Sequence, residues 1–212
     1  MKLQEIADAI ENAKADYFAE IVEGVEAAKA KAQRIAGDST RSSEWINSQT
    51  TSLIEEYNAA RQAKAEKVAA KLETLYQDGL DGAADAFAKQ PTTGELAYLQ
   101  AFNMKERITK SDVDSAMRSL VHSAVASAAV CERAAACGVK CEKPVPGYIA
   151  VSGVYSECVE ADKGLVMAYG RASRTGSGSG MAFSSDSLRE SMRAKYVANE
   201  FTNALRVVSE FE

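Results

Sequence analysis

The sequence predicts an all-α protein, with a long N-terminal antiparallel helical (coiled-coil) hairpin followed by a C-terminal helical bundle. Three observations lead to this fold class. Apolar residues recur at steps of three and four over most of the 212 residues, which is the period of one face of a helix. Only 3 prolines and 13 glycines occur, which disfavours a turn-rich β-sandwich. Alanine is abundant and, with Glu, Lys and Leu, favours long helices.

The first long helix is expected to begin near Leu3 and to end at Ile35. Its apolar stripe contains Leu3, Ile6, Ile10, Ala13, Tyr17, Ile21, Val25, Ala28, Ala32 and Ile35. The segment GDSTRSS from Gly37 then supplies a C-terminal glycine and several N-capping side chains. A second stripe follows at Ile46, Leu53, Tyr57, Ala60, Val68, Leu72 and Leu75, and continues to Phe87. At about 1.5 Å per residue the first helix would reach roughly 50 Å, so we expect residues 1–90 to project as a hairpin domain.

Both helices of this hairpin carry a narrow stripe among many polar residues and alanines, and two interpretations stay open. The two stripes can cover each other fully and leave only a solvated outer face. Alternatively, they cover each other incompletely and leave apolar area for a partner. The second interpretation predicts an interaction surface, which would comprise Ile10, Tyr17, Ile21, Tyr57, Val68 and Leu72.

Residues 91–212 are expected to form the helical bundle. Pro91 stops the preceding helix, and Thr92 with Glu95 forms a capping box for a short helix. Thr109 and Asp112 can open the next helix in the same way, and its stripe of small residues is expected to run unbroken from Val113 to Ala135.

The segment from Tyr148 to Tyr169 has valines that favour a strand locally, but its apolar residues keep a helical step, with Asp162 as the polar exception. We therefore predict a helix. Residues 172–185 are expected to form a Ser/Gly-rich loop, and Ser187 with Glu190 is expected to cap a final helix.

Four cysteines and a single histidine are the candidates for a metal or redox site. Cys131, Cys137 and Cys141 lie within eleven residues of one another, with Cys158 further on and His122 upstream. Their spacing lacks the C-x2-C pairs typical of zinc sites, and free cysteine commonly packs as a small apolar residue. Packing is thus favoured over a metal or redox site, and we expect no cofactor.

Charge and composition disfavour several function classes. The net charge of −5 and a pI near 5.2 argue against a nucleic-acid binder. No apolar run approaches the roughly 20 residues that span a bilayer, and the N-terminus lacks a signal-peptide pattern, so a cytoplasmic protein is expected. The segment RTGSGSG lacks the lysine of a P-loop, and no H-E-x-x-H motif is present. No enzymatic activity is predicted.

One segment carries a family resemblance. TTGELAYLQAFNMKERITKSDVDSAM, from Thr92 to Met117, resembles small helical proteins from the structural gene clusters of tailed phages and prophages of Gram-positive bacteria. In that family a charged coil precedes a capped E-x-x-x-L-Q helix, matched here by Glu95, Leu99 and Gln100, and an acidic-capped helix follows, matched by Asp112. The Phe102-Asn103-Met104 segment departs from the family's leucine-rich version. The resemblance implies a virion or assembly role without catalysis.

The leading hypothesis is a non-enzymatic phage virion structural or capsid-assembly protein that acts through helix-mediated self-association and protein–protein contact. Its expected partners are further copies of itself and capsid or other virion proteins, with no nucleic acid and no membrane. It would occur in the host cytoplasm during assembly, with the virion as a second location. An alternative is a bacterial cytoplasmic helical adaptor that binds one protein partner. A third hypothesis is a cysteine-based metal or redox module.

Overall fold

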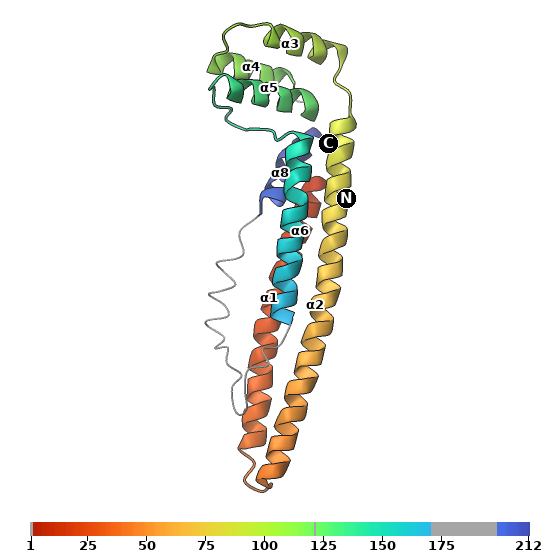
Figure 1. The fold of residues 1–212 in the computed structure, drawn as a ribbon, viewed down its shortest axis with the longest axis vertical. Helices are drawn as coiled ribbons and strands as arrows, with labels where there is room; N and C mark the ends of the chain where they lie inside the picture. The colour runs from red at the N-terminus through yellow and green to blue at the C-terminus, as the bar shows by residue number, and fades with distance from the viewer. Residues whose placement is uncertain (1, 121, 171–198) are drawn as a thin grey trace. The chain divides into compact units, whose positions relative to one another are not determined.

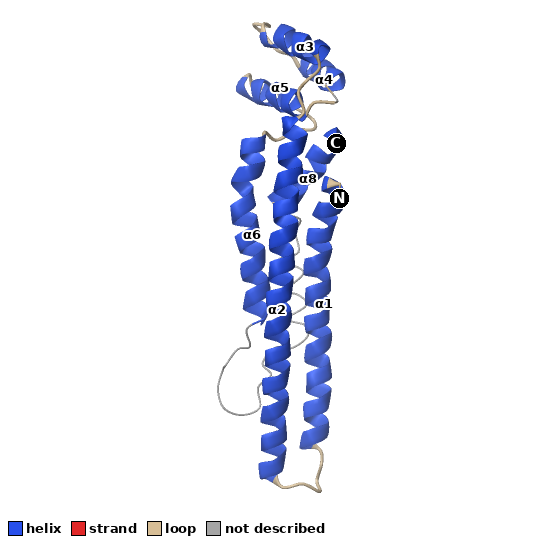
Figure 2. Ribbon diagram, turned by 90° about the vertical axis from the view of Figure 1, so that its right-hand side faces the viewer, coloured by secondary structure: helices blue, strands red, loops and turns tan. Residues whose placement is uncertain are grey.

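The computed structural model describes residues 2–120, 122–170 and 199–212, and every regular element in these ranges is helical (Figures 1 and 2). The α-helices are α1 (Leu3–Ala36), α2 (Ser43–Ala88), α3 (Thr93–Asn103), α4 (Lys110–Ser119), α5 (Ala124–Ala136), α6 (Tyr148–Gly170) and α8 (Glu200–Val208), and the short 3-10 helix η1 (Ser209–Phe211) follows. The predicted all-α class with a long N-terminal helix pair is confirmed. The predicted loop at 172–185 and the predicted cap at Ser187 lie outside the described residues.

The chain divides into two compact units. The first unit comprises Met1–Ile10, Thr74–Val159 and Ala198–Glu212, and the second comprises Glu11–Glu73 and Glu160–Val197. Each unit therefore combines segments from both sides of residue 90. The division into a projecting hairpin of residues 1–90 and a bundle of residues 91–212 stays a prediction.

In the second unit α1 and α2 run antiparallel and α6 lies along both (Figures 1 and 2). Glu20 of α1 pairs with Lys64 of α2, and further along α1 Gly24 contacts the ring of Tyr57, which lies earlier in α2. The contacts of α6 fix its direction as well. Lys14 and Phe18 of α1 meet Asp162 and Tyr169 in ascending order, so α6 is parallel to α1. On α2, Glu73 and Ala65 meet Lys163 and Gly170 in descending order, so α6 is antiparallel to α2.

In the first unit α3, α4 and α5 pack against one another around a small core. That core contains Phe102, Ile108, Val113, Ala116, Leu120, Ala126, Val130 and Ala134. Both predicted capping boxes are present. The backbone N–H and the hydroxyl of Thr92 donate to Oε2 of Glu95, each at 2.8 Å, and the Glu95 N–H donates back to Oγ1 of Thr92. Two orphan N–H groups at the start of α3 are thereby satisfied.

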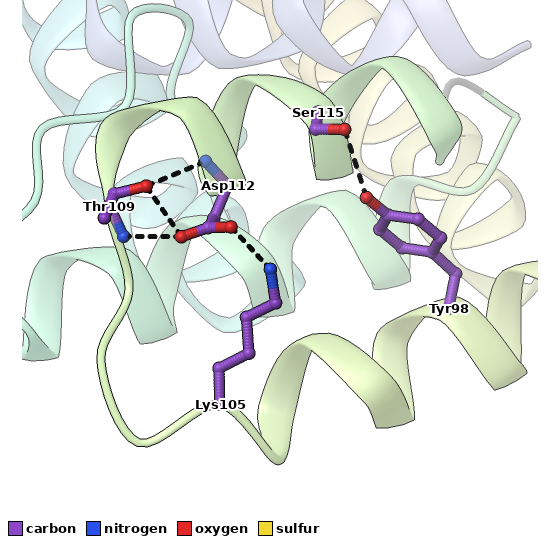
Figure 3. A network of polar contacts seen from close by, with 5 residues as sticks. All are labelled: Tyr98, Lys105, Thr109, Asp112 and Ser115. Carbon is purple, nitrogen blue, oxygen red and sulfur yellow. Dashed lines mark hydrogen bonds and ion pairs between the residues drawn. The ribbon is translucent and has the colours of Figure 1, made fainter.

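Figure 3 shows the second capping box and its neighbours. The Thr109 N–H donates to Oδ2 of Asp112 at 2.9 Å, and Lys105 donates to Oδ1 of the same carboxylate at 2.5 Å. The hydrogen bond from Lys105 is the largest cause that holds the pKa of Asp112 well below its usual value, followed by the hydrogen bonds from Thr109. Tyr98 of α3 donates to Ser115 of α4 at 3.3 Å, so polar contacts also tie these two helices together.

The expectation of one unbroken helix from Val113 to Ala135 is wrong. The chain breaks between α4 and α5, where Leu120 caps the end of α4 and Ser123 caps the start of α5. The Ser123 hydroxyl oxygen accepts the N–H of Ala126 at 3.2 Å, and the Ser127 hydroxyl donates to the Leu120 carbonyl at 2.9 Å. The break lets two short helices pack small residues against each other, which a straight helix could not do.

The first unit also contains an apolar region around α8. Tyr76 of α2 stacks on Phe201 of α8 with ring centroids 5.1 Å apart, and Tyr155 of α6 meets the same Phe201 ring edge-on at 5.7 Å. The two chain ends also meet in this unit. The N–H of Leu3 donates to both carboxylate oxygens of Glu212, at 3.0 and 3.1 Å, so the last residue caps the first helix.

Candidate functional site

Most residues of the predicted interaction surface are buried in the protein core. Four are at most 4 % exposed, namely Ile10, Tyr17, Ile21 and Leu72, while Tyr57 and Val68 are half-buried. The interpretation that these side chains remain partly exposed to solvent is therefore wrong for the four buried residues. Contact of these residues with a partner stays a prediction. The exposed large apolar side chains of the hairpin are at other positions, Trp45 and Ile54.

A polar layer crosses the core of the second unit where α1 meets α6. Lys14 donates to Oδ2 of Asp162 at 2.7 Å, and the two side chains are only 5 % and 13 % exposed. One turn further along α1, the hydroxyl of Tyr17 donates to the carbonyl of Val166 at 2.9 Å. Burial raises the pKa of Tyr17 to about 12, although the charge of Arg61 acts in the opposite direction. The layer thus fixes the register of α6 on α1, since a shift by one turn would leave both charges buried and unpaired.

Tyr57 of α2 borders the same layer. Burial raises its pKa, and the nearby Arg61 counteracts part of the effect. Its ring lies against Gly24 of α1, where an added Cβ would come within 3.1 Å of the ring. Gly24 therefore provides the space that lets a large aromatic residue sit between two closely packed helices.

The turn end of the hairpin is the part of the second unit that lacks a core. We call residues 29–64 the hairpin tip, and no side chain in this range is buried. Trp45 is 36 % exposed and Ile54 is 37 % exposed. The half-buried apolar residues of the tip are Ala32, Ile35, Ile46, Leu53 and Tyr57. The guanidinium of Arg41 lies 5.0 Å from the centre of the Trp45 ring, which holds the indole at the turn.

Two of the four cysteines come together in the first unit. Helix α5 ends in a Schellman motif, in which the N–H of Val139 donates to the Ala134 carbonyl at 2.9 Å and the N–H of Gly138 donates to the Ala135 carbonyl at 3.0 Å. Gly138 has φ +71°, a conformation that glycine adopts without strain. The motif turns the chain back along α5, and the Sγ atoms of Cys131 and Cys141 lie 3.1 Å apart.

The other candidate ligands do not join this pair. Cys137 is exposed at the end of α5, and Cys158 lies on α6. His122 was expected within a helix but lies exposed in the turn between α4 and α5. In the ranges 2–120, 122–170 and 199–212, no three His, Cys, Asp or Glu side chains come together as a metal site requires.

An open surface depression of about 300 Å³ is lined by Lys110, Lys140 and Glu142. Lys110 and Glu142 form an ion pair across it at 2.5 Å, with both side chains more than 60 % exposed. Because this pair lies in solvent, its two charges largely neutralise each other and contribute little to stability.

Neither the pairing of Lys14 with Asp162 nor that of Cys131 with Cys141 was predicted from the sequence, although each had one signal there. Asp162 was recognised as the polar exception in an apolar stripe, and a buried carboxylate needs a cation. Lys14 follows an alanine of the first stripe, so it could have been identified as that cation. The pairing of Cys131 with Cys141 depends on the chain reversal at Gly138, for which the glycine was the available signal.

No helix in the described part of the chain is both long and apolar enough to cross a membrane. Comparison of the chain with protein-family models, with curated proteins and with solved structures finds no match in any of the three.

Proposed function

We propose that the protein is a non-enzymatic structural or assembly protein that self-associates through its hairpin tip. The observation that carries the proposal is the absence of a core in this segment: no side chain of residues 29–64 is buried, while Trp45 and Ile54 stay more than one-third exposed. The apolar contact surface thus lies nearer the turn than the predicted surface around Tyr17 and Leu72.

The physical reason is the poor stability of an isolated helix pair. Burying apolar area contributes roughly 25 cal/mol per Å², and the tip forgoes much of this contribution because its stripe residues are only half-buried. Two such tips packed side by side would form four helices around one shared core. Symmetric pairing of identical surfaces is the commonest arrangement among oligomers, so a second copy of this chain is the proposed partner.

The resemblance of residues 92–117 gives the proposed setting, which is assembly of a tailed-phage particle. There, self-associated copies would contact capsid or other virion proteins in the host cytoplasm, without binding nucleic acid or a membrane. Because this setting rests on the resemblance alone, its test is separate from that of self-association: phage terminase, portal and capsid genes beside this one would support it.

Light scattering coupled to size-exclusion chromatography tests self-association. We expect the wild-type protein to form a dimer or larger oligomer as its concentration rises. The double variant Trp45→Glu/Ile54→Glu should stay monomeric, because the two residues lie on opposite flanks of α2 and a contact on either flank would bury a carboxylate. The matched control Ser48→Glu/Ala59→Glu adds the same charge to exposed positions on the outer face of α2 and should assemble as the wild type does.

A wild-type chain that stays monomeric at every concentration would contradict self-association and would favour the single-partner adaptor. Equal assembly of both double variants would show that copies meet at another surface. Circular dichroism of each variant checks that it remains helical.

A further inference from the structure

The cysteine pair in the first unit has surroundings that differ from those of the other cysteines. Cys131 is buried at 7 % exposure, and Cys141 is half-buried. Both lie in an apolar cluster with Ala124, Ala128, Val145 and Phe211, against which Met117 packs. The contacts of the two sulfur atoms are defined. Sγ of Cys131 is 3.8 Å from the Met117 sulfur and accepts the N–H of Val145 at 3.4 Å, and Sγ of Cys141 is 3.5 Å from the Lys143 carbonyl.

The backbone holds this pair from both sides. Cys131 belongs to the regular part of α5, and Cys141 is positioned by the Schellman turn at Gly138 before it and by the Val145 N–H contact to Cys131 after it. The separation of 3.1 Å between the sulfur atoms exceeds a disulfide bond of roughly 2.05 Å by about 1 Å, a gap that small side-chain rotations can close. Cys137, by contrast, is exposed at the C-terminal end of α5.

We infer that Cys131 and Cys141 form a thiol–disulfide pair that is oxidised by small-molecule disulfides such as glutathione disulfide and is reduced by the corresponding thiol. The bond would close a loop of nine intervening residues and fasten the segment after Gly138 to α5. This inference concerns the first unit and is independent of the proposed self-association, which involves the second unit.

The accessibility of the two thiols sets the order of the steps. The thiolate of half-buried Cys141 attacks one sulfur of glutathione disulfide, a mixed disulfide forms on Cys141, and one glutathione thiolate leaves. Cys131, after losing its proton, then attacks Sγ of Cys141, and the second glutathione thiolate leaves. The two cysteines are thereby oxidised, one glutathione disulfide is reduced to two thiols, and the two cysteine protons go to the leaving thiolates. Cys131 attacks second because it is buried away from molecules in solution, while its Sγ already lies 3.1 Å from Sγ of Cys141. Burial also raises the pKa of Cys131 to about 12, so loss of its proton is expected to slow this step.

The test is an equilibration of the full chain in glutathione redox buffers, followed by alkylation of the remaining thiols and peptide mass spectrometry. We expect a Cys131–Cys141 disulfide to form in the folded protein. Its equilibrium constant should be at least about tenfold larger than in a denaturant, where only the flexible loop keeps the two thiols near each other. The variant Cys131→Ser should accumulate the mixed disulfide on Cys141, and Cys141→Ser should stay largely unmodified at Cys131.

Cys137→Ser is the matched control, because Cys137 is an exposed cysteine from the same segment; it should oxidise at positions 131 and 141 as the wild type does. Equal equilibrium constants in buffer and in denaturant would overturn the inference. It would equally be overturned if the disulfides of the wild type involved Cys137 or linked two chains. A serine variant that fails to fold leaves the wild-type comparison between buffer and denaturant intact as the deciding measurement.

Discussion

At the scale of single residues, the buried ion pair between Lys14 and Asp162 is the most consequential contact of the second unit. Removing one partner leaves the other charge buried, which typically costs about 3–5 kcal/mol. We predict a loss of this size in the free energy of unfolding for Lys14→Met and for Asp162→Leu separately, measured by urea denaturation. The double variant should recover most of the loss, because an apolar pair of similar volume replaces the ion pair.

The exposed ion pair between Lys110 and Glu142 provides the control for that cycle. Its side chains are 61 % and 66 % exposed, so Lys110→Met should change the free energy of unfolding far less than Lys14→Met does. If the Lys14 and Asp162 losses simply added in the double variant, the two groups would not be energetically coupled, and the register role of the pair would be wrong.

Because burial raises the pKa of Tyr17, we predict that the protein loses stability at alkaline pH. Below pH 10 the phenol is neutral in both the folded and the unfolded chain, so its ionisation does not change the free energy of unfolding. Between pH 10 and about 12 the unfolded chain ionises while the folded chain keeps the proton, so folding stability is lost as the pH rises through this window. A shift of this size corresponds to about 3 kcal/mol. Urea titrations below pH 10 and near pH 12 measure the loss.

Tyr17→Phe separates this effect from the alkaline behaviour of other groups. The variant should lose about 1 kcal/mol at neutral pH, since its ring cannot donate to the Val166 carbonyl. Between pH 10 and 12 the free energy of unfolding of the variant should fall less than that of the wild type, because the variant lacks the ionisable group of Tyr17. Tyr57, whose pKa is also raised, remains in both proteins and accounts for part of the residual slope. An unchanged slope would contradict the assignment.

At the scale of elements, substitution by alanine is expected to have opposite effects on stability at two glycines of α6, Gly164 and Gly170. Gly170 is buried, and an added Cβ would collide with Cβ of Ala65 on α2, so the two helices could not keep their close approach. Gly164 on the same helix faces open space. Gly170→Ala should therefore destabilise by about 1–3 kcal/mol, while Gly164→Ala should stabilise by roughly 0.5–1 kcal/mol. Thermal unfolding of the two variants checks the pair, and equal shifts of the same sign would refute the packing argument.

The elements themselves could be predicted wherever their signals were local. The capping boxes at Thr92 and Thr109 depend on residues three positions apart, and both are present. The apolar residues from Tyr148 to Tyr169 recur at a helical step, and the predicted helix is present although its valines favour a strand. Burial of one helix face determines the secondary structure here more than the local propensity of the valines does. The break at Ser123 was missed because the stripe of small residues continues across it. Contacts that join distant segments, such as Lys14 with Asp162, depend on tertiary register, which periodicity does not fix.

At the scale of the whole molecule, buried side chains are unevenly distributed along α2. From Ala65 onward the helix carries a series of buried residues that ends near Ala86, while residues 43–64 carry none. Local opening is cheapest where few apolar contacts hold a helix. We therefore predict that, in dilute protein, backbone amides of residues 43–64 exchange with deuterium at least about tenfold faster than those of residues 65–88. Hydrogen exchange followed by peptide mass spectrometry resolves the two halves of the helix.

The same experiment at increasing concentration connects this uneven stability to self-association. If a second copy covers the hairpin tip, its amides should become more protected as oligomers form, because opening would then also have to break the contact. The gain should persist in Ser48→Glu/Ala59→Glu and disappear in Trp45→Glu/Ile54→Glu, while the amides of α5 in the first unit stay unchanged in all three proteins. Uniform protection along α2 at every concentration would mean that the tip is stable without a partner, which would remove the physical reason for the proposed assembly.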